Sequence, residues 1–426
     1  MSNFFKIYKG LSSEVYRIAI VRFVLSMGNF IYPFMTLFLV EKLHIEPSIT
    51  SLFFITSALM FVPASIVSGR ISDKTGRRII LLSSFFIYII IIFSIFVLYH
   101  FNILRNVIVA ILLIIANLFL SMTQVPIAAI ITDVTKPSNR NESFSFVYLA
   151  ANAGFAFGPL IAGFLFQRYT SMIFLGNALA SLVGFIILCG IKETKPDIEN
   201  KYLADYSDNL IKNEDENKND TNDNFSKDVK KIDDSAINFI FKDKIFLLFI
   251  IATIFFSFAY SQAGFTLPIF LVKIFEEDGA KIYGIIQSTN AITVILLTPM
   301  VSYLTKKKSA FLMVALAGVF YAVGFGLYGV FKIFPLFLLT TIIWSTGEII
   351  QVTHQNVFVA NRSPINIRGQ LNGAFQILSG IGFLLGPVFS GFFQKRFNII
   401  YVWLVVFLIC LIGSLQLFIS YKKVNN

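Results

Sequence analysis

Twelve apolar runs of about 20 residues each divide this chain, and a helix of that length crosses the roughly 30 Å hydrocarbon core of a bilayer. The runs lie near residues 18–40, 47–68, 79–99, 107–131, 143–166, 171–191, 245–272, 281–303, 309–331, 335–360, 367–393 and 398–420. They are too long for strands and lack strand alternation, so we predict helices whose backbone groups bond within each segment. With 56% hydrophobic and 14% charged residues, a soluble domain of this size could not cover its apolar surface, so the expected solvent is lipid.

One glycine pattern occurs in two of these runs, at positions 228 residues apart. The first copy comprises Arg140, Gly154, Gly158, Pro159 and Gly163, and the second comprises Arg368, Gly382, Gly386, Pro387 and Gly391. Small residues four positions apart let helix backbones approach closely, and a proline can bend the helix. The copies indicate a duplicated unit, and doubled helical halves are the usual construction of secondary transporters. The pattern fits either a hinge or a packing seam without a gating role, and both interpretations stay open.

The chain divides into residues 1–191, a polar segment 192–244, and residues 245–426. The middle segment holds 14 acidic and 10 basic residues and almost no apolar periodicity. We therefore expect a solvated, largely disordered linker between two six-helix bundles. A passive tether is favoured over a regulatory element.

Basic residues indicate how the helices are oriented. With both termini inside, the short cytoplasmic segments hold 16 Lys and Arg residues and the outer loops hold 8, which favours cytoplasmic termini. This bias also accounts for the net charge of +11. Since the basic residues are spread over many loops, we expect no nucleic-acid partner; the expected partners are the lipid bilayer and a small-molecule substrate, and the expected state is a monomer.

The loop between the second and third runs reads GRISDKTGRR. It resembles the signature loop of the major facilitator superfamily, with the matching residues at Gly69, Asp73, Gly76, Arg77 and Arg78. The resemblance implies an all-α membrane protein with twelve transmembrane helices in two pseudo-symmetric six-helix bundles.

The same resemblance implies a cytoplasmic gate. Asp73 would face the N-terminus of the eleventh helix near residues 367–370, where the helix dipole stabilises a carboxylate. Arg77 would pair with Asp133 at the end of the fourth helix and lock the outward-open state. The expected gate residues are Gly69, Asp73, Gly76, Arg77, Arg78, Asp133 and Arg140.

The segment from Gly154 to Gly163 is similar to the fifth-helix motif of the superfamily's exporters, and the chain resembles bacterial multidrug-efflux members, the drug/proton antiporters. Those antiporters usually carry an arginine in the fourth helix, which this run lacks. Proton coupling would therefore rest on another group.

Glu348 is the one acid of 24 that lies deep in an apolar run. A charged group there costs about 2.5–3.5 kcal/mol on insertion scales, so it faces water, protein or a partner, or it is protonated. A polar stripe surrounds it at helical spacing, and its members are Thr341, Ser345, Glu348, Gln351 and Gln355. The stripe predicts a helix face that lines a cavity, with Glu348 as a proton carrier or a binder of a cationic substrate. A buried carboxyl bonded to a neighbouring helix is the alternative.

Other polar residues within the runs are candidate substrate contacts. They are Asn117, Ser121, Gln124, Tyr260, Gln262, Gln287 and Asn290. Arg22 lies little more than a turn into the first run, so snorkelling to the surface is at least as plausible as a functional pairing. His354 could relay protons, although a hydrogen bond near the cytoplasmic end is the favoured interpretation.

These observations predict a secondary transporter in a bacterial cytoplasmic membrane that exports small, largely apolar compounds by alternating access. Proton-coupled uptake of a sugar or peptide is the alternative, and a non-transporting sensor or scaffold is a remote one. The three histidines lie far apart in sequence, with no nucleophile or phosphate-binding motif. We therefore expect no enzymatic activity, no metal and no cofactor, with a proton gradient as the energy source.

Overall fold

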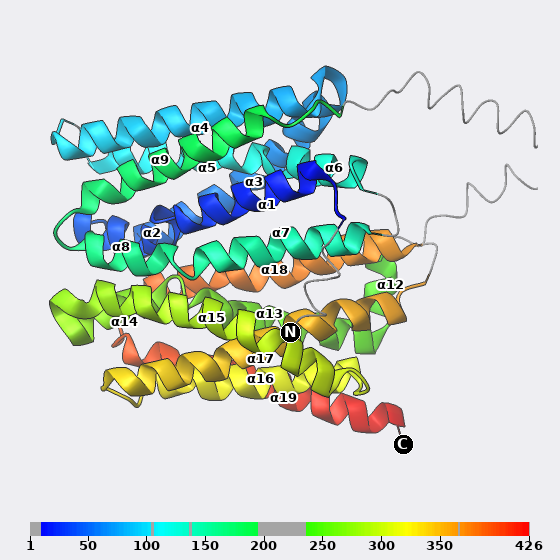
Figure 1. Ribbon diagram of the computed structural model, residues 1–426. Coiled ribbons are helices and arrows are strands. Elements are labelled where there is room, and N and C mark those ends of the chain that lie inside the picture. Colours follow the sequence, from blue (N-terminus) through cyan, green and yellow to red (C-terminus); the bar gives the residue numbers. More distant parts are fainter. Residues whose placement is uncertain (1–9, 104–105, 136–138, 195–235, 365–366, 426) are drawn as a thin grey trace, which may run out of the picture.

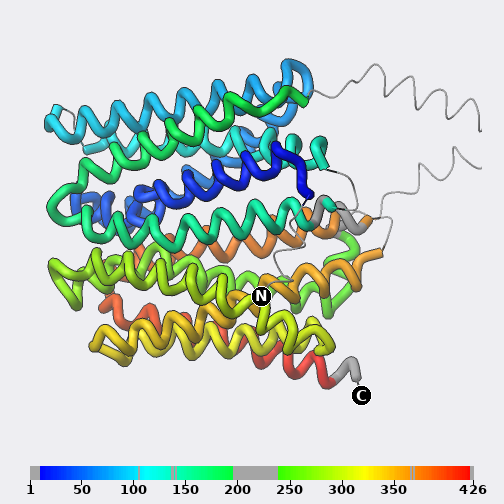
Figure 2. The backbone as a smooth tube through the Cα atoms, viewed as in Figure 1, coloured from blue at the N-terminus to red at the C-terminus, as the bar shows by residue number. Residues whose placement is uncertain are grey.

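The computed structural model describes residues 10–103, 106–135, 139–194, 236–364 and 367–425. Within these ranges the chain forms helices and no strand, arranged as two bundles that lie side by side (Figure 1). Figure 2 shows that the division follows the sequence, because the half before the grey segment 195–235, coloured blue to green, packs against the half after it, coloured green through yellow to red. The predicted all-helical fold in two halves is confirmed.

The described part of the first half contains nine α-helices, several of which pair into one membrane pass. They are α1 (Ser13–Met27), α2 (Ile31–Leu37), α3 (Pro47–Thr75), α4 (Arg77–His100), α5 (Asn106–Met122), α6 (Gln124–Asp133), α7 (Arg140–Phe155), α8 (Gly158–Phe166) and α9 (Thr170–Cys189), with a π-helical turn at Phe38–Lys42.

The second half repeats this plan after a short additional helix. Its helices are α12 (Ala236–Lys242), α13 (Lys244–Ser261), α14 (Thr266–Phe275), α15 (Gly279–Thr305), α16 (Ala310–Leu327), α17 (Phe334–Arg362), α18 (Arg368–Phe393) and α19 (Ile400–Asn425), with a 3-10 turn at Glu276–Asp278. Helix α12 occupies part of the predicted linker, and residues 195–235 of that linker lie outside the described residues.

Eleven helical stretches of the described residues are long and apolar enough to cross a membrane. One of them, Lys244–Thr305, is 62 residues long and is more than one pass requires. The chain reverses inside it at Glu276, whose φ of 48° lies in the left-handed region. This stretch therefore contains two passes, α13 with α14 and then α15, as the twelve apolar runs predict.

Prolines accompany breaks in the first helix of each half. The chain leaves helical geometry between α1 and α2, before Pro33, and between α13 and α14, before Pro268. A proline cannot bond the carbonyl four residues earlier, which for Pro268 is that of Gly264. The Thr36 hydroxyl from the other half donates to this carbonyl at 2.7 Å, so a neighbouring helix satisfies the freed group.

The two glycine patterns make equivalent contacts. A Cβ on Gly154 would meet the backbone of α1 at Phe23 and Met27, and a Cβ on Gly382 would meet the backbone of α13 at Ile254. The first glycines thus bring α7 and α18 against the first helix of their own halves.

The last glycine of each pattern contacts the opposite half instead. Gly163 approaches the backbone of α15 at Ala280 and Gly284, and Gly391 approaches α3 at Pro47 and Ser51. Small residues at these positions let backbones of different halves touch, and we call these two contacts the glycine seam.

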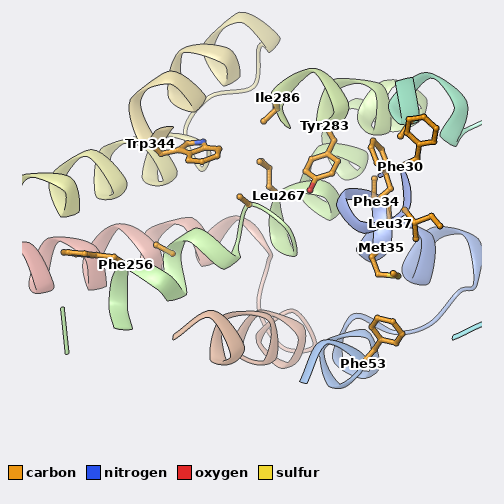
Figure 3. Close-up of a cluster of buried hydrophobic side chains, with 14 of the residues drawn as sticks. Phe30, Phe34, Met35, Leu37, Phe53, Phe256, Leu267, Tyr283, Ile286 and Trp344 are labelled. Carbon is orange, nitrogen blue, oxygen red and sulfur yellow. The ribbon is translucent and has the colours of Figure 1, made fainter. Parts of the chain in front are cut away.

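The glycine seam lies at one end of the molecule. We call the end where α3 finishes and α12 and α13 begin the linker end, and the opposite end, which holds the seam, the far end. Hydrogen bonds, ion pairs and ring contacts that join the halves between described residues gather toward the far end. They include the Lys395–Glu46 ion pair at 3.1 Å and the Phe34–Tyr283 ring pair at 5.3 Å, two rings that Figure 3 shows close together. The structure is therefore closed at the far end.

Asp243, which lies between α12 and α13, connects the start of α13 to the end of α17 at the linker end. It accepts hydrogen bonds from the first amides of α13, those of Ile245 and Phe246. Its carboxylate also accepts two hydrogen bonds from the Arg362 guanidinium at the end of α17, at 2.7 and 3.0 Å. Burial opposes ionisation of Asp243, but these hydrogen bonds and the Arg362 charge outweigh it and lower the pKa of the carboxyl.

We predict that alanine at Gly154 or Gly382 lowers the free energy of unfolding by about 1–3 kcal/mol, because the added methyl group overpacks against a helix backbone. Alanine at Gly373 or Gly380 on α18, where a Cβ would have no atom within 4 Å, is the matched control. Thermal unfolding of the purified variants measures the difference. Equal melting temperatures for Gly382→Ala and Gly380→Ala would contradict the packing account.

The Asp243 contacts predict a pH-dependent stability. Asparagine can still cap a helix, so Asp243→Asn removes mainly the charge and should lower the melting temperature at pH 7. A carboxyl with a depressed folded pKa stabilises fully above its unfolded pKa of about 3.9 and loses this contribution as pH falls through the folded value. The difference in melting temperature between Asp243→Asn and the wild type should therefore become smaller below about pH 4. A melting-temperature difference that stays constant down to about pH 3 would contradict a stabilising ion pair between Asp243 and Arg362.

Candidate functional site

Two adjoining hollows lie between the halves. The hollow on the side of the second half has a volume of about 140 Å³ and is lined from α13, α15 and α17. The one on the side of the first half measures about 450 Å³ and is lined from α3, α5 and α6. Both hollows share the lining residues Tyr32, Phe54, Phe383 and Pro387. We treat them as two lobes of one central cavity, the C-lobe and the N-lobe.

Glu348 lies directly behind the wall of the C-lobe. The Tyr260 hydroxyl donates to its Oε1 at 3.0 Å, and the Asn290 amide donates to its Oε2 at 2.8 Å. Tyr260 and Asn290 both line the C-lobe. Both carboxylate oxygens therefore have neutral donors, and no cation of the described residues lies within ion-pair distance of them.

The neighbours of Glu348 hold this arrangement in place. The Asn290 amide also donates to the Ser345 hydroxyl at 2.9 Å, one helical turn before Glu348 on α17. The Tyr260 ring packs edge-on against Trp344, with ring centroids 5.9 Å apart. Three helices, α13, α15 and α17, thus meet at one carboxylate.

The remaining predicted polar residues of α17 serve other contacts. Thr341 bonds with the Tyr328 hydroxyl at 2.8 Å, and the Gln351 amide donates to Gln355 at 3.1 Å. His354 bonds with the Thr305 hydroxyl at 2.7 Å near the linker end, as the favoured interpretation expected. The structure brings neither Gln351 nor Gln355 into the lining of the two lobes.

Two predicted contacts from the second half differ in their surroundings. Gln287 lines the C-lobe and donates to Tyr283 at 2.8 Å. Gln262 is fully buried, donates to the Phe258 carbonyl and accepts from Ser390 of α18. These hydrogen bonds indicate that Gln262 connects α13 to α18 rather than contacting a substrate.

The opposite wall belongs to the first half. Asn117, Ser121 and Gln124 line the N-lobe, as the polar residues of the fourth run predicted. Arg22 of α1 donates from Nη2 to Gln124 Oε1 at 2.8 Å. Arg22 therefore points into the bundle, and the snorkelling interpretation was wrong.

The predicted gate residues lie at the linker end. Arg77 forms an ion pair with Asp133, as expected. The pair joins α4 to α6 within the first half and is present while the far end is closed, so the expected role as a lock of the opposite state does not follow from this structure. Asp73 is exposed and has no hydrogen bond or ion pair with a described residue. The side chain of Arg140 lies outside the described residues.

Glu193, which follows α9, contacts the loop between α3 and α4 and was not predicted from the sequence. Its carboxylate accepts hydrogen bonds from the amides of Arg77 at 2.8 Å and Arg78 at 3.2 Å, at the start of α4. It also occupies the space where a Cβ of Gly76 would stand, and Gly76 has a φ of 117°, which favours glycine. The only indication of this capping role in the sequence was an acidic residue directly after the sixth apolar run.

Comparison with known proteins identifies the family. The family model of the Major Facilitator Superfamily matches residues 18–387. The chain belongs to this superfamily. It is 23% identical to the "Uncharacterized MFS-type transporter YqjV" of Bacillus subtilis (strain 168), over 92% of this chain and 90% of that protein. It is also 23% identical to the "Na(+), Li(+), K(+)/H(+) antiporter" of Planococcus maritimus, over 84% of each chain.

Solved structures support the same fold. A peptide transporter POT in complex with sulfate superposes with a TM-score of 0.73 at 15% identity, covering 98% of this chain and 96% of that one. The nucleoside transporter NupG superposes with a TM-score of 0.67 at 16% identity, covering 97% of this chain and 99% of that one. The family match, rather than the likeness of fold, makes the protein a multi-pass membrane transporter of the superfamily and not an enzyme.

We predict that Glu193→Ala lowers the free energy of unfolding by about 1 kcal/mol, because the first amides of α4 lose their acceptor. Glu193→Gln keeps an acceptor oxygen and should cost less. Glu277→Gln, which changes an exposed acid at the far end, is the control, and thermal unfolding is the measurement. A Glu193→Ala variant as stable as this control would show that the cap contributes nothing.

Proposed function

We propose that this superfamily member is a proton-coupled secondary transporter that exports small, largely apolar compounds by alternating access. In this proposal the linker end faces the cytoplasm of a bacterial cell and Glu348 carries the proton. The observation that carries the proposal is a carboxylate beside the central cavity that has neutral donors and no counter-ion among the described residues. The similarity to a cation/proton antiporter supports the direction of coupling.

Protonation of Glu348 would change the wall of the C-lobe. An ionised carboxylate accepts the Tyr260 and Asn290 hydrogen bonds, whereas a protonated carboxyl carries a donor of its own. A proton on Oε1 would face the Tyr260 hydroxyl donor, so this hydroxyl would rotate and accept instead. Since Tyr260 lines the C-lobe and packs on Trp344, the proton alters the surface that a substrate meets.

The remaining elements fit alternating access. The halves are joined at the far end through the glycine seam, and the exposed Asp73 at the linker end can engage α18 when that end closes. An apolar cavity wall, with Phe54 and Phe383 shared by both lobes, suits a largely apolar substrate. No metal or cofactor enters this proposal, and the described residues contain no group of His, Cys, Asp and Glu that could hold a metal ion.

Glu348→Gln tests the proton-carrier role. In inverted membrane vesicles that hold a pH gradient, addition of a substrate should dissipate the gradient through the wild type. A panel of neutral, anionic and cationic naphthalene derivatives serves as the probe set. We expect Glu348→Gln to abolish the response, because glutamine cannot exchange a proton, and Glu348→Asp to retain part of it.

The control for this experiment is Glu277→Gln, which removes an exposed acid outside the cavity. Full gradient dissipation by Glu348→Gln would remove the proton-carrier role. Accumulation of the probe in right-side-out vesicles would favour uptake over export.

A further inference from the structure

A guanidinium lies inside the first bundle without a carboxylate partner among the described residues. Arg22 is nine residues into α1, about 13 Å along the helix axis from its start. Its one hydrogen bond to a described residue goes to the neutral Gln124 side chain. No described carboxylate lies within ion-pair distance of it. A cation inside an apolar run is costly unless it faces water, protein or a partner, and one neutral acceptor compensates little of that cost.

The acceptor of this hydrogen bond belongs to the central cavity. Gln124 lines the N-lobe with Asn117 and Ser121. Its amide nitrogen donates to no described residue, so its N–H groups remain free for a ligand. Arg22 therefore reaches the cavity through a side chain that presents further donors to it.

The chemistry of this wall selects an anion. A guanidinium carries five N–H donors in a planar fork that matches the oxygens of a carboxylate, sulfonate or phosphate. The amide N–H groups of Gln124 add donors on the same side. In Arg22 and Gln124, the groups that have no partner among the described residues are N–H groups, which are all hydrogen-bond donors.

Apart from Tyr32 and Ser57, the rest of the N-lobe lining is apolar. Phe53, Phe54, Phe61 and Phe383 stand in its lining, and its volume of about 450 Å³ is large enough for an aromatic ring system. An oxyanion head at Gln124 would place an attached apolar body among these rings. An inorganic oxyanion would leave them without a partner.

Resting on the transport function proposed above, we propose that the substrate is an amphipathic organic anion. Arg22 and Gln124 bind its oxyanion head, and the aromatic wall of the N-lobe binds its apolar body. Glu348 lies on the other side of the cavity and exchanges the proton. The two charges thus have separate tasks in separate halves, which rock against each other around the bound molecule.

Equilibrium binding to the purified full-length protein in detergent tests this assignment without any pH gradient. The probes are naphthalenesulfonate and the neutral naphthalenesulfonamide, which share a ring system and differ in charge. We expect the sulfonate to bind at least about tenfold more tightly, because a hydrogen bond to a charged group is stronger than one to a neutral group. Inorganic sulfate should bind much more weakly than the sulfonate.

Two variants locate the anion site. Arg22→Gln should remove the preference for the sulfonate. Gln124→Glu keeps the size of the side chain and supplies Arg22 with an internal carboxylate, so it should remove the preference as well. Because Gln124→Glu leaves Arg22 in place, this variant still tests the anion site if Arg22→Gln does not fold. Arg168→Gln, which changes an exposed cation of the same half, should bind like the wild type.

The outcomes separate this proposal from the proton-carrier role. Glu348→Gln should keep the sulfonate preference even though it loses pH-driven transport. A wild type that binds both probes equally, or a Gln124→Glu variant that keeps the preference, would overturn the anion site. Sulfate that binds as tightly as the sulfonate would overturn the role of the aromatic wall.

Discussion

The structure depends on close backbone contact at glycines of α7, α8 and α18. Gly154 and Gly382 bring these helices against the first helix of their own halves, and Gly163 and Gly391 bring them against the other half. A Cβ at Gly154 or Gly382 would overlap the facing backbone, and one at Gly163 or Gly391 would crowd it. These contacts therefore shape both the internal packing of each bundle and the line where the bundles meet. The central cavity is the space that remains beside this line.

Charge in a low-dielectric interior is the second constraint, and the protein meets it differently in each half. Glu348 receives two neutral hydrogen bonds, while Arg22 has a single neutral acceptor among the described residues. The ion pairs Arg77–Asp133 and Arg362–Asp243 lie near the ends of helices instead. The two interior charges therefore stand beside the cavity, where a proton or a ligand can reach them, and this placement connects the fold to transport.

The sequence predicted the features that lipid imposes directly. A membrane pass needs one contiguous apolar run, so the twelve passes could be read from the chain, and the glycine copies identified the two halves. The Arg77–Asp133 pair followed from a family resemblance. Contacts between distant residues could not be found this way, because helix periodicity does not say which helices are neighbours. Arg22 and Gln124 are 102 residues apart, and Glu193 caps a helix whose first residue lies 116 positions before it. From the sequence, Gln262 was as good a candidate substrate contact as the other polar residues, and only its hydrogen bonds to α13 and α18 distinguish it.

The central claim is that two bundles swing about the cavity and close one end while they open the other. Paired spin labels measure this most directly, in a background where Cys189 and Cys410 are replaced by serine. One pair replaces Glu46 and Lys395 at the far end, and the other replaces Lys74 and Gln370 at the linker end. Across a pH titration in liposomes, the first distance should lengthen while the second shortens. Distances that change in the same direction, or that do not change at all, would contradict the account.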